Sequence, residues 1–289
     1  MGWLWDTITG WIKDVLVDAI KGNLAGMFND VNSKVGTIAG DVGQTPAGWN
    51  GSIFNMIKGI SDTAIVPIAG MIITFVLVHE LVTMVMEKNN MQDIDTFNFF
   101  KYFIKAGIAV FVVSHTFTIV SGIFDVGQWV VTQSASVIGG HTYIDIAAVL
   151  NSMDAGLRAM SIGELLGLLM ETSLMSMCMS IISICITIII YGRMIEIYLY
   201  CSVAPIPFAT FTNKEWGQVG NNYLRGLLAL AFQGLLIMVC VGIYAVMVNT
   251  LTVTANIHAS IWMVAAYTVL LCFTLFKTGS LSKQIFNAH

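Results

Sequence analysis

Ionisable side chains inside long apolar stretches are the residues of this sequence best suited to chemistry. They are His115, Glu171, Arg193, Glu196 and Arg225, with His79 and Glu80 nearer the end of an apolar run. Charged groups at membrane depth are costly, so they commonly mark ion paths, proton relays or substrate sites. The three-residue spacing of Arg193 and Glu196 also allows them to pair on one helix face.

Each of these residues also has a simpler interpretation. Arg193 and Glu196 would serve as an interfacial anchor at the turn between two segments. Glu171 lies near enough to the end of a span to reach the headgroups, and a lone His115 is typical of hydrogen-bonded packing. The sequence shows no His/Cys/carboxylate cluster with metal-ligand spacing, no phosphate loop and no nucleophile with a plausible base. We therefore expect no enzyme, no cofactor and no metal.

The composition indicates a membrane protein. Of the 289 residues, 56% are hydrophobic and only 10% are charged, whereas soluble domains carry about 25% charged residues. The mean hydropathy is +0.80. A net charge of -4 without clustered Lys and Arg argues against a nucleic-acid-binding surface. The five cysteines all lie in apolar runs without a CxxC, so we interpret them as small apolar side chains.

The apolar runs predict an all-α, polytopic helical membrane protein. A span needs about 20 apolar residues, and the candidates are 63–86, 102–124, 165–192, 226–249 and the slightly shorter 259–276. A sixth run, 194–211, is broken by two prolines and is expected to enter the membrane and return. Residues 1–62 form an N-terminal region of amphipathic helices ahead of the transmembrane domain, 63–289.

The N-terminal region begins with an amphipathic pattern and continues as a heptad-like seam. Apolar residues from Leu4 to Ala19 recur at helical spacing, which suits a helix in the membrane interface or one packed on sister subunits. A 4-3-4-3-4 spacing follows at Leu24, Phe28, Val31, Val35, Ile38 and Val42. Because several glycines weaken this helix in isolation, it needs neighbours, and we predict that the seam joins copies of the chain.

Two polar seams run along the second and third spans. The first contains Ser114, Thr118 and Ser121 and continues beyond the span; a helix that persisted from Lys101 to Ile138 would be about 57 Å long and would project from the membrane. The second contains Ser173, Ser176, Ser180, Ser183 and Thr187. Hydroxyls in membrane helices commonly bond to their own backbone or permit close packing, and a water-lined path is the alternative.

The lysines and arginines predict the orientation. They gather at Lys88, Lys101 and Lys105, in 212–225 and at the C-terminus, whereas 250–260 has none and 125–164 has only Arg158. If 194–211 dips in and returns, all the cationic segments lie in the cytoplasm. The N-terminus and residues 125–164 then lie outside, and the C-terminus lies inside.

Pro205 and Pro207 interrupt the sixth apolar run. Proline lacks a backbone donor and clashes with the preceding turn, and a broken helix is tolerated in lipid only where protein or water covers it. The segment is therefore buried among helices or lines a lumen. A polar turn, TNKEWGQ, follows, and then a span with Arg225, Gln233 and several glycines that permit close helix contact.

The stretch LYCSVAPIPFATFTNKEWGQVGNNYLRGLLALAFQGLL resembles the most recognisable region of the TrbL family, polytopic inner-membrane components of type IV secretion and conjugation machines. In that family an apolar run ends in a proline-containing break and a polar turn with an aromatic residue, and a helix with a central glutamine follows. The matching positions are Pro205, Pro207, Phe211, Trp216 and Gln233. The resemblance covers residues 198–240 in motif and 60–280 in layout. The short central loop departs from many relatives.

The resemblance implies a homo-oligomeric ring in the cytoplasmic membrane. The ring would help DNA or protein cargo pass from a cytoplasmic ATPase to the outer assembly, in contact with stalk subunits, and the proline break would be a hinge or lumen-facing elbow. A secondary transporter with a site at the broken helix and a non-transporting scaffold are the alternatives. The sequence shows no internal repeat and no second proline-broken segment, which argues against the transporter.

Overall fold

The chain folds almost entirely into helices. The computed structural model describes residues 2–87, 96–139, 145–213, 215–250 and 257–288. Helices account for 92% of the structure, and the described residues contain no strand, which confirms the all-α prediction. The two longest helices are α1 (Gly2–Val42) and α8 (Ile162–Val203), of 41 and 42 residues. At 1.5 Å per residue each is about 60 Å long, twice the thickness of a bilayer core.

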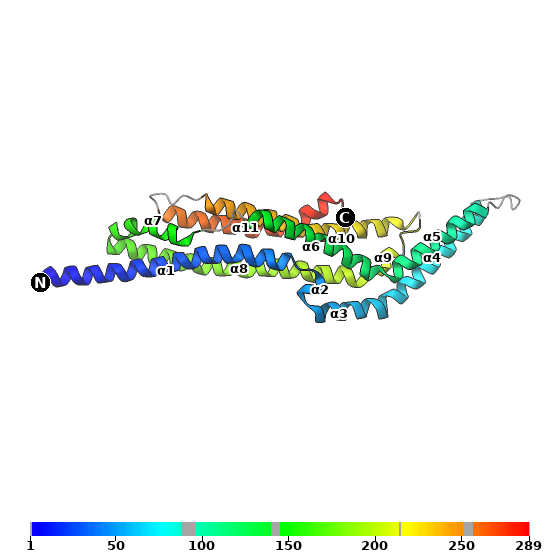
Figure 1. Ribbon diagram of the computed structural model, residues 1–289, viewed down its shortest axis with the longest axis horizontal. Helices are drawn as coiled ribbons and strands as arrows, with labels where there is room; N and C mark the ends of the chain where they lie inside the picture. The colour runs from blue at the N-terminus through cyan, green and yellow to red at the C-terminus, as the bar shows by residue number, and fades with distance from the viewer. Residues whose placement is uncertain (1, 88–95, 140–144, 214, 251–256, 289) are drawn as a thin grey trace. The chain divides into compact units, whose positions relative to one another are not determined.

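The remaining elements follow α1 in an order that Figure 1 traces by colour. They are α2 (Pro46–Trp49), α3 (Gly51–Ile60), a π-helical turn η1 (Ser61–Ile65), α4 (Val66–Glu87), α5 (Thr96–Ser114), α6 (Thr116–Gly139), α7 (Ile146–Ala159), α9 (Pro205–Phe208), α10 (Gly217–Asn249) and α11 (Ile257–Ile285). Side-chain caps set several of the helix starts, because the side chains of Thr45, Asn50 and Asp145 accept hydrogen bonds from backbone N–H groups in the first turns of α2, α3 and α7.

Four helical stretches are long and apolar enough to cross a membrane: Gly51–Met86, Ile162–Val203, Gly217–Asn249 and Ile257–Ile285. A fifth candidate is the bent pair Phe99–Ser114 and Thr116–Ile138. Their positions agree with the five spans expected from the sequence, and the chain is a multi-pass membrane protein. The proposed boundary at residue 62 concerns which helices enter the membrane, and it stays a prediction.

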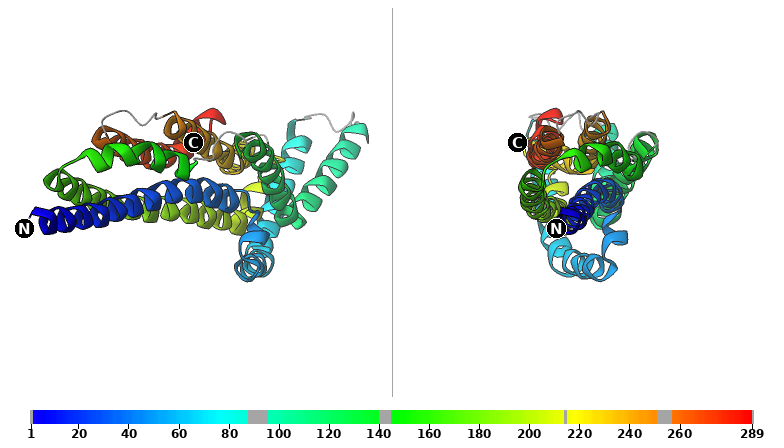
Figure 2. Two further views of the ribbon diagram at one scale, coloured as in Figure 1. Left: turned by 60° about the vertical axis from the view of Figure 1, so that its left-hand side comes forward. Right: turned by 90° about the vertical axis from the view of Figure 1, so that its left-hand side faces the viewer.

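The first of two compact units contains 1–42, 131–190 and 236–278. Its core joins α1 to α7 and to parts of α8, α10 and α11, and Figures 1 and 2 both show α1 lying along α8. The six seam residues are all buried here: Leu24, Phe28, Val31, Val35, Ile38 and Val42. The seam is therefore covered within the chain. This corrects its assignment to a contact between copies, because apolar helices elsewhere in the same chain supply the neighbours that it needs.

The second unit contains 43–130, 191–235 and 279–289. One part of its core joins α6 to the end of α8, α9 and the start of α10, and includes Phe117, Tyr198, Phe208 and Leu227. A smaller part joins α4 and α5 through residues such as Ile73 and Val113. Figure 2 shows α4 and α5 as two neighbouring helices within this unit.

The second span is not a straight rod. Its two halves, α5 and α6, meet at His115 with a bend of 70°. Ser114, His115 and Thr116 all bond back to carbonyls of the preceding turn: Ser114 Oγ to Val110 O at 2.8 Å, His115 Nδ1 to Phe111 O at 3.0 Å and Thr116 Oγ1 to Val112 O at 2.8 Å. Such bonds compete with the helical ladder and bend helices. The continuous helix from Lys101 to Ile138 that the polar rhythm allows is therefore interrupted at His115.

The third span does not turn at Gly192 and Arg193. Helix α8 continues to Val203, so residues 194–203 extend the third span and 194–211 is not a separate re-entrant segment. Residues 212–225 still lie on the same side of the membrane as the C-terminus when α8 crosses once. The reason is that α10 and α11 each cross the membrane after this segment, and two crossings return the chain to the same side. Lys88, Lys214 and residues 251–256 lie outside the described residues, and the orientation stays a prediction.

Candidate functional site

The prolines lie just beyond the end of α8, where the chain reverses into α10. Pro205 occupies the first turn of the short helix α9, a position that tolerates a residue without an N–H. Because neither Pro205 nor Pro207 has an N–H, the carbonyls of Cys201 and Val203 lose the donors that a continuous helix would supply. Pro205 and Phe208 are buried. The break is thus covered by protein, as a broken helix in a membrane protein must be.

Side chains of the turn hold this reversal closed. Thr210 Oγ1 donates to Pro207 O at 2.8 Å and accepts from Gly220 N at 3.1 Å, so it joins α9 to the first turn of α10. Asn213 Oδ1 accepts from the backbone N–H groups of Glu215 and Trp216 at 2.7 and 3.0 Å. These bonds replace helical ladder bonds at the start of α10. We call residues 204–220 the proline elbow.

Close approach between the two sides of the elbow depends on a glycine. A Cβ atom placed on Gly220 would lie 2.8 Å from Pro207 O, a distance that real Cβ atoms essentially never show, and 3.1 Å from the Phe211 ring, which is also a tight contact. The same principle applies at Gly226, where the Tyr200 ring would lie 3.1 Å from an added Cβ. The glycines of α10 therefore let α8 and α9 pack directly on its backbone.

Aromatic side chains tie the elbow to its surroundings. Phe211 packs edge-on against Phe208, with ring centroids 5.0 Å apart. Trp216 stacks on Phe75 of α4 with centroids 5.5 Å apart and lies 5.7 Å from the His79 ring. The elbow residues expected from the sequence thus lie together, except for Gln233. That buried residue is 13 positions beyond Gly220 on α10, about 20 Å away along the helix, and lies next to Gly279 of α11.

Arg193 is buried in the core of the second unit, with 7% of its surface exposed. Its Nη2 donates to Leu230 O of α10 at 3.3 Å, and its Nε has no hydrogen-bond partner among the described residues. Glu196 instead accepts from Lys283 Nζ at 2.9 Å. Within the described chain, no ion pair joins Arg193 to Glu196, so the pair that their i, i+3 spacing allows does not form there. The two residues face different helices: Arg193 contacts α10, and Glu196 contacts α11.

Two of the other ionisable groups in apolar stretches have local partners. Glu171 Oε2 forms a hydrogen bond with His258 Nδ1 of α11. His115 lies at the bend between α5 and α6, with its ring 4.3 Å from the Phe111 centroid. Arg225 lies half-buried in α10. Among the described residues, no group of three His, Cys, Asp or Glu side chains has the arrangement needed for a metal ion.

The hydroxyls of the two polar seams bond mostly to their own helices. Along α8, Ser176 donates to Thr172 O, Ser180 to Ser176 O and Thr187 to Ser183 O at 3.0–3.1 Å. On the first seam, Ser121 donates to Phe117 O at 2.8 Å and Thr118 is exposed. Ser173 differs, because its hydroxyl accepts from Asn23 of α1. Back-bonding explains most of the pattern without a water path.

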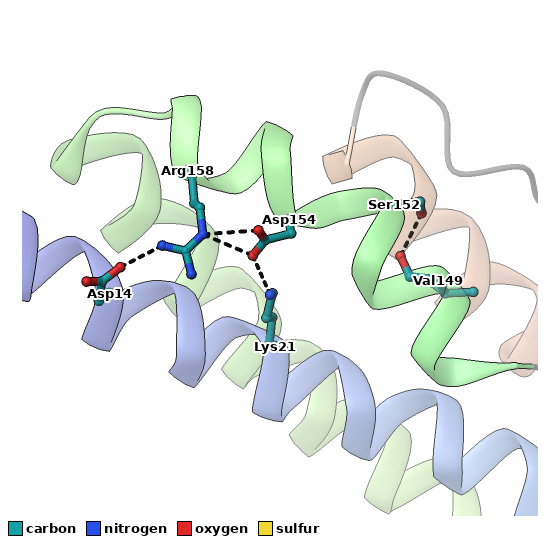
Figure 3. Close-up of polar contacts among 6 residues, drawn as sticks. All are labelled: Asp14, Lys21, Val149, Ser152, Asp154 and Arg158. Carbon is teal, nitrogen blue, oxygen red and sulfur yellow. Dashed lines mark hydrogen bonds and ion pairs between the residues drawn. The ribbon is translucent and has the colours of Figure 1, made fainter.

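An acid–base cluster between α1 and α7 was not anticipated. Figure 3 shows Arg158 between Asp14 and Asp154, with Lys21 reaching the same Asp154 carboxylate. Arg158 Nη1 lies 2.7 Å from Asp14 Oδ1 and Arg158 Nε 3.0 Å from Asp154 Oδ2. The Lys21 hydrogen bond, aided by Arg158, holds the pKa of Asp154 below its usual value, and both aspartates raise the pKa of Arg158. Only the i, i+4 spacing of Asp154 and Arg158 signals this cluster in the sequence.

Comparison with known proteins identifies the family. Residues 31–205, more than half of the chain, match the family described as TrbL/VirB6 plasmid conjugal transfer like protein. Comparison with curated proteins and with solved structures gives no significant match. The matched region includes the α1 seam from Val31 onward, the bend at His115, α8 and the first proline of the elbow. The chain therefore belongs to the TrbL/VirB6 plasmid conjugal transfer family.

Proposed function

We propose that this protein is a channel or platform subunit of a conjugative type IV secretion machine, and that it helps DNA or protein cross the cytoplasmic membrane. The family match carries the proposal, because it places the chain in a conjugal transfer system. The proline elbow supports a role in the path itself. It is a covered, hydrogen-bonded reversal just beyond the end of a 42-residue membrane helix, and its two prolines keep that helix from continuing.

The second part of the proposal concerns assembly. Several copies form a ring, with a cytoplasmic ATPase and stalk subunits as further partners and with lipids around the outside. Exposed hydroxyls at Ser173, Ser180 and Thr187 repeat every seven residues along α8, and such small polar side chains suit contact between membrane helices. Because the α1 seam is buried within the chain, this face of α8 is a better candidate for the contact between copies.

The third part concerns orientation, with the N-terminus outside the cytoplasmic membrane and the C-terminus in the cytoplasm. In this orientation the elbow lies at the cytoplasmic end of α8, where cargo leaves the ATPase. Cysteines introduced at Asp145 and Glu215 test it, because an impermeant thiol reagent added outside should label position 145 and spare position 215. The reverse labelling pattern would overturn the orientation. Both residues are exposed, so neither substitution buries a new group.

The experiment that tests the function is a transfer assay with cargo crosslinking. Deletion of the gene in a donor cell should abolish plasmid transfer, and the wild-type gene should restore it. The transferring strand should then crosslink to this protein in the restored donor and not in a donor whose ATPase is inactive. Transfer that survives the deletion contradicts the family-level role. Restored transfer without any crosslink would instead favour the scaffold, and saturable uptake of a small solute would favour the transporter.

A further inference from the structure

One face of α5 forms an open groove that the proposed function does not use. Its lining residues are Lys101, Ile104, Lys105 and Ile108 of α5 and Thr212 of the elbow, and its volume is about 280 Å³. The four α5 residues are spaced i, i+3, i+4 and i+7, which places them on a single helix face. The groove lies wholly within the second compact unit.

The groove is lined by two lysines and two isoleucines that alternate along α5. Lys101 comes first, Ile104 and Lys105 follow one turn later, and Ile108 lies a further turn along, with 48% and 58% of the surfaces of Ile104 and Ile108 exposed. The separation from Lys101 to Ile108 is about 10 Å along the helix axis. The two lysines, which we call the polar end, therefore lie on average about 4.5 Å nearer the start of the span than the two isoleucines, as the headgroup of a lipid lies above its upper acyl chains.

The charges at the polar end favour an anion. Lys105 Nζ contacts Glu80 Oε1, and Lys101 Nζ lies 4.5 Å from the centroid of the Phe97 ring. The two lysines and Glu80 together carry a net charge of +1. Thr212 Oγ1 is buried and has no hydrogen-bond partner among the described residues, so its hydroxyl is available to donate to an acceptor in the groove.

We propose that this groove binds one anionic phospholipid. The phosphate lies between Lys101, Lys105 and the Thr212 hydroxyl, and an acyl chain lies over Ile104 and Ile108. Lysine stems and isoleucines complement an alkyl chain, and a basic pocket beside a membrane helix favours an acidic headgroup. A free phosphate ion matches only the polar end. The inference depends on insertion of α5 into the membrane and not on the transfer function.

The test is native mass spectrometry of the detergent-purified full chain, titrated with phosphatidylglycerol or with phosphatidylcholine. The first phosphatidylglycerol should bind several-fold more tightly than the first phosphatidylcholine. Lys101→Gln should weaken that first event about fivefold, the effect of one lysine at a lipid surface. The matched control is Lys277→Gln, an exposed lysine of α11 outside the groove, which should leave it unchanged. Ile108→Trp, which fills the groove and keeps both cations, should also weaken binding.

Three results would overturn the proposal. Equal affinity for the two lipids would show that charge is not recognised. Equal losses of phosphatidylglycerol affinity in Lys101→Gln and Lys277→Gln would show that the lipid is attracted to any cation on the protein surface and not to this groove. Displacement of the lipid by millimolar inorganic phosphate would show that the site takes a free anion. Lys105 is not substituted alone, because its loss would strand the partly buried Glu80 carboxylate.

Discussion

A single methyl group added at Gly220 should open the proline elbow. An added Cβ would lie 2.8 Å from Pro207 O, and ordinary contact begins at 3.4 Å, so the two segments must separate by about 0.6 Å (3.4 minus 2.8). Overpacking of this kind costs about 1–3 kcal/mol. The shift also strains the hydrogen bond between Gly220 N and Thr210 Oγ1. Gly220→Ala should therefore destabilise the fold and loosen the elbow.

The matched control is Gly192→Ala in α8, where an added Cβ meets no atom within 4 Å. Both variants replace a helical glycine, and each gains at most about 1 kcal/mol of helix propensity, so most of that gain cancels in their difference. We expect the free energy of unfolding of Gly220→Ala to be about 1–3 kcal/mol lower than that of Gly192→Ala. Equilibrium unfolding of purified protein in mixed micelles, followed by tryptophan fluorescence, measures this. A difference below about 0.5 kcal/mol would refute the close contact between α9 and α10.

Three further predictions concern buried and charged groups. Arg193→Met removes a buried cation whose one hydrogen bond among the described residues is to the Leu230 carbonyl, so stability in the same unfolding assay should be unchanged or higher by about 1–4 kcal/mol; a clear loss would contradict this. Val31→Asp places a carboxylate at a fully buried position and should lower the amount of folded protein in the membrane. Normal levels of folded protein with an altered oligomeric state would instead show that the seam joins copies of the chain. The hydrogen bond from Lys21 is the first cause of the lowered pKa of Asp154 in the folded protein. The ionised carboxylate therefore stabilises the fold fully at pH values above its usual pKa of 3.8, and this stabilisation is lost as pH falls through the lower pKa of the folded state. The protection of α7 amides from hydrogen exchange, corrected for the intrinsic pH dependence of the exchange rate, should therefore be constant near neutral pH and fall only in strong acid, and Asp154→Asn should remove that acid dependence.

The helices and their approximate positions could be predicted from the sequence because apolar length is a local property. The five expected spans all correspond to helices or to one bent pair. The elbow was also visible locally, since Pro205 and Pro207 carry their own backbone restriction. The burial of the α1 seam was not, because a heptad pattern shows that a face needs a partner and does not say which helix supplies it.

The errors in the sequence interpretation share a physical cause. The spacing of Arg193 and Glu196 allowed a local pair, yet each side chain turned to a different neighbouring helix. The bend at His115 arises from three consecutive side chains bonding to the preceding turn, and rotamers of this kind cannot be read from periodicity. Continuity of α8 through Gly192 likewise follows from tertiary packing that outweighs the intrinsic preference of glycine.

The measurement that tests the central claim most directly is plasmid transfer by a Pro205→Ala, Pro207→Ala donor, normalised for membrane level. The two alanines restore two backbone donors, each worth about 0.5–1.5 kcal/mol, so the straight helix gains about 1–3 kcal/mol and the ratio of bent to straight chains falls about 5–150-fold. Pro67→Ala, at an exposed proline of α4, is the control and should transfer normally. We predict normal insertion and a transfer loss of up to that factor in the double variant. Wild-type transfer at an equal membrane level would contradict the role of the elbow in the transfer path.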